Sequence, residues 1–116
     1  MIDPAAKGYR GEMAAVKLCQ KLGLKNARRG LSQSAGAIEA DVVCDSLKDF
    51  WIEVKNRKAG SVIYSYLDQA ERDSENTPKT PIVLYKTNNK KFLVIADAEF
   101  ILPILAGHSS RRTDHQ

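Results

Sequence analysis

The chain has 116 residues, 43% of them hydrophobic and 28% charged, which is the balance of an ordinary globular domain. No apolar run approaches the ~20 residues that a membrane span needs, and the N-terminus lacks the apolar core of a signal peptide. A transmembrane or secreted protein is therefore not expected, and a cytoplasmic location is. The length predicts one domain over residues 1–106, followed by a flexible polar tail over residues 107–116.

The net charge of +4 is unevenly distributed along the chain. Residues 1–30 hold seven basic and two acidic side chains, whereas residues 31–116 sum to a charge of −1. A positive field concentrated in one region is expected where a protein meets a phosphate backbone. A solvated helix face that happens to be basic explains the same charge, so the charge alone leaves both explanations open.

The first predicted helix spans residues 5–23, with Asp3 and Pro4 as start signals and Gly23 as the stop. Glu12 lies at the edge of the apolar stripe of this helix. A carboxylate that points inward is a candidate member of a metal site. Near the start of a helix it can equally serve to stabilise the helix dipole.

A small polar segment, residues 30–36, follows a predicted strand that begins within residues 26–29. Side chains suited to phosphate oxygens stand at its base and along its course: Arg28, Arg29, Ser32, Gln33 and Ser34. This composition predicts a loop that clasps a DNA backbone, and it is equally typical of a plain linker. Its position directly before Asp41 favours the DNA-binding interpretation.

Two strands joined by a short polar turn are predicted between Asp41 and Lys55. Glu53 and Lys55 are two residues apart, so in a strand both side chains leave the same face. Asp41 begins the first strand, where it can lie opposite them. An unpaired charge at the start of a buried strand would be unfavourable, which points to a role for this carboxylate.

Two carboxylates that converge with one ammonium group suit a hard cation such as Mg²⁺, which keeps several of its waters free for chemistry. Asp41, Glu53 and the carbonyl of Val54 offer hard oxygen ligands to Mg²⁺, for which Mn²⁺ is expected to substitute. Lys55 would orient or help to deprotonate an attacking water, or offset charge on a phosphate. A solvated strand face with an ordinary Glu–Lys pair is the alternative explanation.

A second helix is predicted after the basic turn of residues 56–60, from a Ser61 cap to about Glu75. Gln69 lies at the border of its apolar stripe, where an amide can reach an active site or simply line the rim of a core. Cys19 and Cys44 lie in apolar surroundings and are expected to be reduced core residues.

The C-terminal third predicts two more strands and a helix. Residues 81–85 are a continuous apolar run typical of a central strand covered on both faces. Residues 88–90 predict a hairpin turn before a strand over residues 92–95. A short apolar helix capped by Asp97 is expected to be interrupted by Pro103.

The order of these features resembles that of the archaeal-type Holliday junction resolvases, including phage-encoded relatives, in the PD-(D/E)xK nuclease superfamily. The resemblance covers residues 7–95 and rests on four segments: Lys7-Gly8-x-x-x-Glu12, the Arg28-Arg29/Ser-rich loop, Asp41-Val-Val and Ile52-Glu-Val-Lys55. Ala40 stands where the superfamily has a proline before the aspartate. The resemblance implies a restriction-endonuclease-like α/β fold, with a central mixed sheet of about five strands flanked by helices.

The same resemblance implies roles for individual residues. Glu12, Asp41 and Glu53 would be the acidic residues of the metal site, Lys55 the catalytic lysine and Gln69 a supporting catalytic residue. The expected DNA-binding residues are basic and polar, and they are Lys7, Arg10, Arg28, Arg29, Ser32, Gln33, Ser34, Asn56, Arg57 and Lys58.

The implied activity is that of a Mg²⁺-dependent endodeoxyribonuclease that resolves four-way DNA junctions by paired symmetric nicks. Two cuts by so small a chain imply a homodimer with one site in each copy. The host cytoplasm would be the setting if a phage encodes the chain. A related restriction or repair nickase is the nearest alternative, and a DNA-binding module that does not cleave is another.

Overall fold

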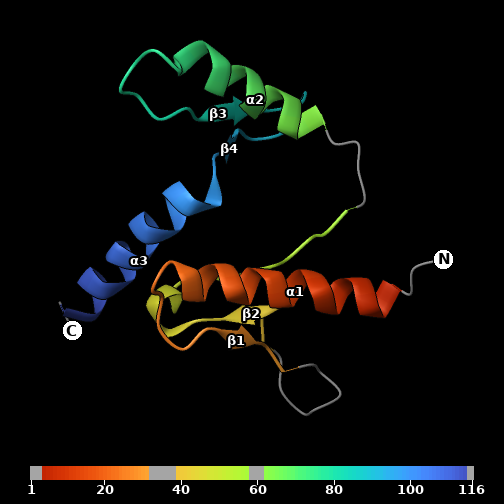
Figure 1. Cartoon of the computed structure of the whole chain (residues 1–116), viewed down its shortest axis with the longest axis vertical. Helices are drawn as coiled ribbons and strands as arrows, with labels where there is room; N and C mark the ends of the chain where they lie inside the picture. Colours follow the sequence, from red (N-terminus) through yellow and green to blue (C-terminus); the bar gives the residue numbers. More distant parts are fainter. Residues whose placement is uncertain (1–3, 32–38, 58–61, 115–116) are drawn as a thin grey trace. The chain divides into compact units, whose positions relative to one another are not determined.

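The computed structural model describes residues 4–31, 39–57 and 62–114 (Figure 1). The described residues form three α-helices, four short strands and one short 3-10 helix. In chain order these are α1 (Pro4–Lys21), β1 (Arg28–Arg29), β2 (Val42–Val43), η2 (Asp45–Leu47), α2 (Val62–Ser74), β3 (Val83–Tyr85), β4 (Leu93–Ile95) and α3 (Ala98–Asp114). None of these helices is long and apolar enough to cross a membrane.

The expected central sheet of about five strands is wrong for this structure. The described strands form two separate antiparallel sheets of two strands each, β1 with β2 and β3 with β4. The chain is therefore a small α/β protein and lacks the restriction-endonuclease-like sheet in its described part. Several of the predicted strands are present but short, and the described residues 50–54 form no strand: η2 begins directly after Cys44, and Ile52 makes an isolated β-bridge to Val42.

Backbone contacts group the chain into two compact units, one of residues 1–57 with 102–116 and one of residues 58–101. In the first unit, α1 packs against β1 and β2 (Figure 1). Gly23 ends α1 as predicted, since its φ of 75° lies in the left-handed region. The amide of Gly23 donates to Gln20 O at 3.0 Å and the amide of Leu24 donates to Cys19 O at 2.9 Å, which is the Schellman arrangement.

The core of the first unit lies between α1, the segment after β2 and the C-terminal part of α3. Its buried members are Cys19, Cys44, Leu47 and Ala106. Both cysteines are free thiols, and burial together with the neighbouring Cys44 thiol raises the pKa of Cys19. A protonated, buried thiol behaves as a small apolar side chain, which agrees with the core role predicted for both cysteines.

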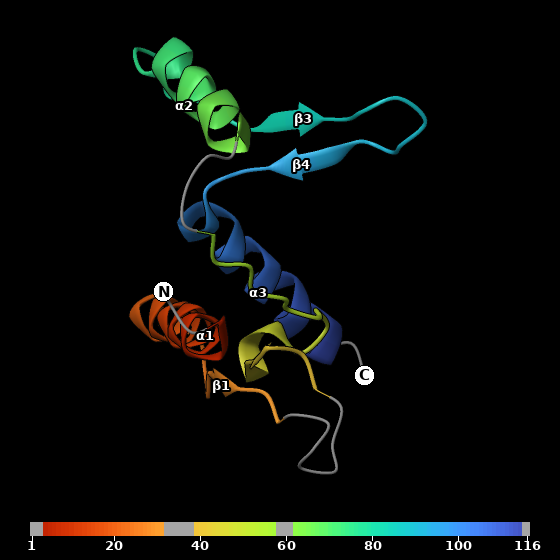
Figure 2. The same ribbon diagram turned by 90° about the vertical axis from the view of Figure 1, so that its right-hand side faces the viewer.

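In the second unit, α2 packs beside the β3–β4 hairpin (Figure 2). The ring of Tyr66 contacts the ring of Tyr85, with centroids 5.8 Å apart. The predicted hairpin turn is confirmed, with Asn89 at a φ of 64° and the amide of Lys90 donating to Thr87 O. Ser61, the expected cap of α2, lies outside the described residues.

The expectation that residues 81–85 form a strand covered on both faces is wrong. Among the described residues β3 pairs with β4 alone, and Leu84 and its partner Val94 are each 61% exposed. An apolar run sets the preference for extended backbone but does not decide which strands pair with it.

The helix α3 begins in the second unit and ends in the first. It continues through Pro103, where the sequence predicted an interruption. It also includes residues 107–114, which were expected to belong to a flexible tail. His108 contributes to this helix, and its ring contacts that of Phe50 at 6.0 Å between centroids.

Candidate active site

The Asp41 side chain is tied to the segment that carries Glu53 and Lys55. Its Oδ2 accepts a hydrogen bond of 2.9 Å from the backbone amide of Val54, the residue between them. One residue inward, Val42 forms an antiparallel bridge with Ile52. In such a pairing the next residues outward, Asp41 and Glu53, stand opposite each other. Asp41 and Glu53 are therefore neighbours across this antiparallel bridge, as the sequence predicted.

Glu53 is held by a residue that the sequence did not single out. The indole Nε1 of Trp51 donates to Glu53 Oε1 at 2.6 Å. Trp51 was predicted to be part of a core-like strand, but it is 62% exposed. The spacing could have revealed the contact, because residues 51 and 53 are two apart and share a face of extended chain.

Lys55 is exposed, two residues beyond Glu53. In extended chain its ammonium group leaves the same face as the Glu53 carboxylate. Asp41, Glu53 and Lys55 thus combine two oxygen donors for a cation with one positive charge for a phosphate. Of these three residues, the structure brings Asp41 to the backbone of the Glu53–Lys55 segment, through the Val54 amide.

The segment after Lys55 passes close to α1. A Cβ built on Gly11 would lie 2.8 Å from Asn56 Cβ, so only a residue without a side chain fits there. Asn56 itself is exposed and was predicted to contact DNA. The close approach places the chain around Val54 and Asn56 beside the turn of α1 that carries Glu12.

The Glu12 carboxylate is engaged by an arginine. Arg29 Nε donates to Glu12 Oε1 at 2.9 Å, and the side chains are 41% and 20% exposed, respectively. The Arg29 guanidinium also lies over the ring of Tyr9, 4.6 Å from its centroid. Two residues predicted for different tasks, one for metal and one for DNA, therefore form an ion pair.

Arg28 is engaged more fully than Arg29. Its Nη1 and Nη2 donate to the two carboxylate oxygens of Glu39, each at 2.9 Å, and Nη1 also donates to Arg29 O at 3.1 Å. Glu39 Oε1 accepts a further bond of 2.8 Å from the Leu31 amide. The Arg28 hydrogen bonds and then the Leu31 amide lower the pKa of Glu39 to about 2. No local pattern in the sequence pairs Glu39 with Arg28, so this contact could not be predicted from spacing.

The other predicted residues belong to other parts of the described chain or lie outside the described residues. Gln69 is exposed on α2 in the second unit. Arg10 and Arg57 are exposed in the first unit. Lys7 lies in the first turns of α1. Ser32, Gln33, Ser34 and Lys58 lie outside the described residues.

The donors of Asp41, Glu53 and Val54 are hard oxygens, the kind of ligand that Mg²⁺ takes in proteins. Within the described ranges no three side chains of His, Cys, Asp or Glu converge as a ready-made cage. Mg²⁺ is commonly held by only one or two carboxylates together with waters and substrate phosphates. The carboxylates of Asp41 and Glu53 and the backbone carbonyl of Val54 would supply that smaller set of hard oxygen ligands.

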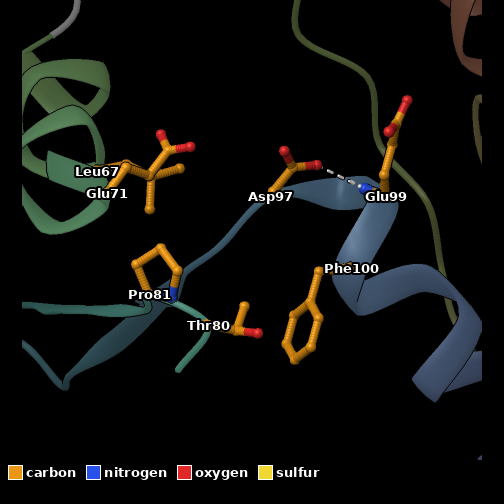
Figure 3. A pocket seen from close by; sticks show the side chains of 7 residues that line it. All are labelled: Leu67, Glu71, Thr80, Pro81, Asp97, Glu99 and Phe100. Carbon is orange, nitrogen blue, oxygen red and sulfur yellow. Dashed lines mark hydrogen bonds between the residues drawn. The ribbon is translucent and has the colours of Figure 1, made fainter. Parts of the chain in front are cut away.

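A hollow of about 380 Å³ lies in the second unit, between α2, the start of β3 and the start of α3 (Figure 3). Its polar lining includes Glu71, Asp97 and Glu99. Figure 3 shows the Asp97 carboxylate directed at the Glu99 backbone amide, which donates to Asp97 Oδ1 at 2.7 Å. Asp97 therefore caps α3 as predicted, a structural task.

Comparisons with family models, with curated proteins and with solved structures each returned no match for this chain.

Proposed function

We propose that this protein is a metal-dependent endodeoxyribonuclease that resolves four-way DNA junctions by paired nicks. The observation that carries the proposal is the 2.9 Å hydrogen bond from the Val54 amide to Asp41 Oδ2. This hydrogen bond links Asp41 to the Glu53-Val54-Lys55 segment. The sequence predicted that the aspartate and this segment belong to one site. The resemblance of the motifs to junction resolvases supports the choice of substrate.

Asp41, Glu53 and the Val54 carbonyl would hold the ion, Mg²⁺ or Mn²⁺. When bound, the ion would supply Lewis-acid stabilisation of a phosphate and a lowered pKa for a water. The Trp51 indole orients the Glu53 carboxylate, and the Val54 amide orients that of Asp41. The exposed Lys55 ammonium offsets negative charge on the phosphate under attack or assists in removing a proton from water.

Binding of DNA would rest on phosphate contacts and junction shape more than on base readout. Seven basic side chains in residues 1–30 provide the attraction. Two copies of the chain would be needed to nick two strands symmetrically, so the active form in this proposal is a homodimer. The reaction would take place in the cytoplasm.

Replacement of Asp41 by Asn tests the site. The amide keeps an oxygen that can accept from the Val54 amide but removes the charge. Cleavage of a four-way junction in Mg²⁺ should fall on the order of 100- to 1,000-fold, while junction affinity measured without divalent metal stays as in wild type. Asp73→Asn, an exposed change on α2 in the second unit, is the matched control.

Full cleavage activity of Asp41→Asn would show that the site is wrongly assigned. Junction binding by the wild type without cleavage in any divalent metal would assign the protein to the class of DNA-binding modules.

A further inference from the structure

Few contacts fix Asp41 in place. The β1–β2 ladder next to it has only two residue pairs, Arg28 with Val43 and Arg29 with Val42. Beyond the ladder, the Gly30 amide donates to Asp41 O at 3.0 Å, and the Asp41 side chain accepts from Val54. A two-residue ladder is marginal by itself. A slip of one residue would turn the Asp41 side chain to the opposite face.

The Arg28–Glu39 pair joins a residue of this ladder to the segment just before Asp41. Glu39 stands two residues before Asp41, and Arg28 is the first residue of β1. Two parallel N–H···O bonds of 2.9 Å fix the pair in one geometry, and the Leu31 amide adds a third at 2.8 Å. Two parallel hydrogen bonds fix the relative orientation of the guanidinium and the carboxylate more tightly than a single charge contact does.

The backbones between the pair and Asp41 are in tight contact. A Cβ built on Gly30 would clash with Ala40 O and would lie 3.2 Å from Glu39 Cβ. The two segments can lie this close only with glycine at position 30. Glu39, Ala40 and Asp41 are consecutive, so the residue that pairs with Arg28 is joined to Asp41 through the one residue that contacts Gly30.

From this geometry we propose that Arg28 and Glu39 are positioning residues for Asp41, and that Arg28 does not serve as a DNA contact. The inference rests on the proposed nuclease function for its effect on the reaction. It assigns the two adjacent arginines different tasks. Both terminal nitrogens of Arg28 are occupied by Glu39, whereas the hydrogen bond of Arg29 to Glu12 uses only Nε.

Three variants of the full chain separate positioning from DNA binding. Arg28→Ala removes the pair, and Arg28→Lys keeps the charge but loses the two-pronged geometry. The double variant Arg28→Glu with Glu39→Arg rebuilds the pair in reverse. Lys48→Ala is the control, because Lys48 is an exposed residue of the same unit and its replacement also removes one positive charge.

The Arg28→Ala and Arg28→Lys variants should lower the single-turnover nicking rate on a four-way junction by on the order of 10- to 100-fold, as expected for a small misplacement of a reacting group. Their junction affinity in EDTA, and its dependence on salt, should match those of Lys48→Ala. The reversed pair should recover most of the rate. Recovery is expected to be partial, because the Leu31 amide loses its acceptor.

Hydrogen exchange of the Val54 amide gives a readout that does not require cleavage. This amide donates to Asp41 Oδ2, so its protection should fall by about tenfold in Arg28→Ala and return in the reversed pair. The Leu24 amide, bonded to Cys19 O in the same unit, reports general unfolding and should keep its protection.

A weaker junction affinity of Arg28→Ala with a salt slope lowered by about one phosphate contact would overturn the inference and make Arg28 a DNA contact. Unchanged protection of Val54 in Arg28→Ala would overturn it as well. If the wild type cuts no DNA in any divalent metal, the proposed function fails, and the Val54 and Leu24 amides still decide whether the pair positions Asp41.

Discussion

Charged side chains in the first unit pair with one another. Glu12 pairs with Arg29, and Arg28 pairs with Glu39. The spacing of Asp41 and Glu53 was sufficient to predict that they lie opposite each other, because two strands joined by a short turn pair with each other. The partners of the arginines could not be predicted, because they depend on how β1 lies against α1 and the segment before β2.

Trp51 is expected to matter for the reaction through its indole N–H. Trp51→Phe keeps an aromatic ring but leaves Glu53 without the 2.6 Å bond. Loss of a partner that orients a metal ligand lowers metal affinity or activity by roughly 10- to 100-fold. We expect a higher Mg²⁺ concentration for half-maximal nicking, with unchanged junction affinity in EDTA. An unchanged Mg²⁺ requirement would mean that the indole does not orient Glu53 during the reaction.

The Arg28–Glu39 pair should survive to unusually low pH. Because the pKa of Glu39 is lowered to about 2, its contribution to stability is complete above the pKa of the unfolded chain, near 4.5, and is lost as the pH falls toward 2. Urea unfolding of the wild type and of Glu39→Gln should therefore differ at neutral pH and converge between these two values. A difference that persists at pH 2 would show that the ionised carboxylate is not its source.

Helices and turns followed the sequence more closely than strands did. Gly23 ends α1 and Asn89 forms the hairpin turn because left-handed backbone at these positions is decided by a few neighbouring residues. The observed strands are two or three residues long, and β3 has an exposed apolar face. Strand pairing depends on distant segments, so the apolar runs alone could not predict two separate hairpin-like sheets.

Two glycines of α1 provide a test of its packing. A Cβ on Gly8 would meet no atom within 4 Å, whereas a Cβ on Gly11 would lie 2.8 Å from Asn56 Cβ. Gly8→Ala should raise the free energy of unfolding by about 1 kcal/mol through helix propensity. Gly11→Ala should lower it, because Asn56 must move. Equal effects of the two changes in chemical denaturation would show that α1 does not approach Asn56 closely.

At the scale of the whole molecule, the proposed chemistry belongs to the first unit. Asp41, Glu53 and Lys55 lie there, as do the basic side chains of residues 1–30, whereas Gln69 lies in the second unit. The sequence indicated both the concentration of charge and the order of the motifs. The grouping into two units depends on contacts between residues far apart in the chain, which composition and spacing do not encode.

The proposed homodimer follows from the reaction, since symmetric resolution of a junction requires two nicks. The most direct measurement is cleavage of a labelled four-way junction beside a linear duplex of the same sequence, in Mg²⁺ and then in EDTA. We expect paired nicks near the branch point in Mg²⁺ only, and none on the duplex. Equal cutting of both substrates would contradict junction selectivity, and no cutting in any divalent metal would contradict the nuclease assignment itself.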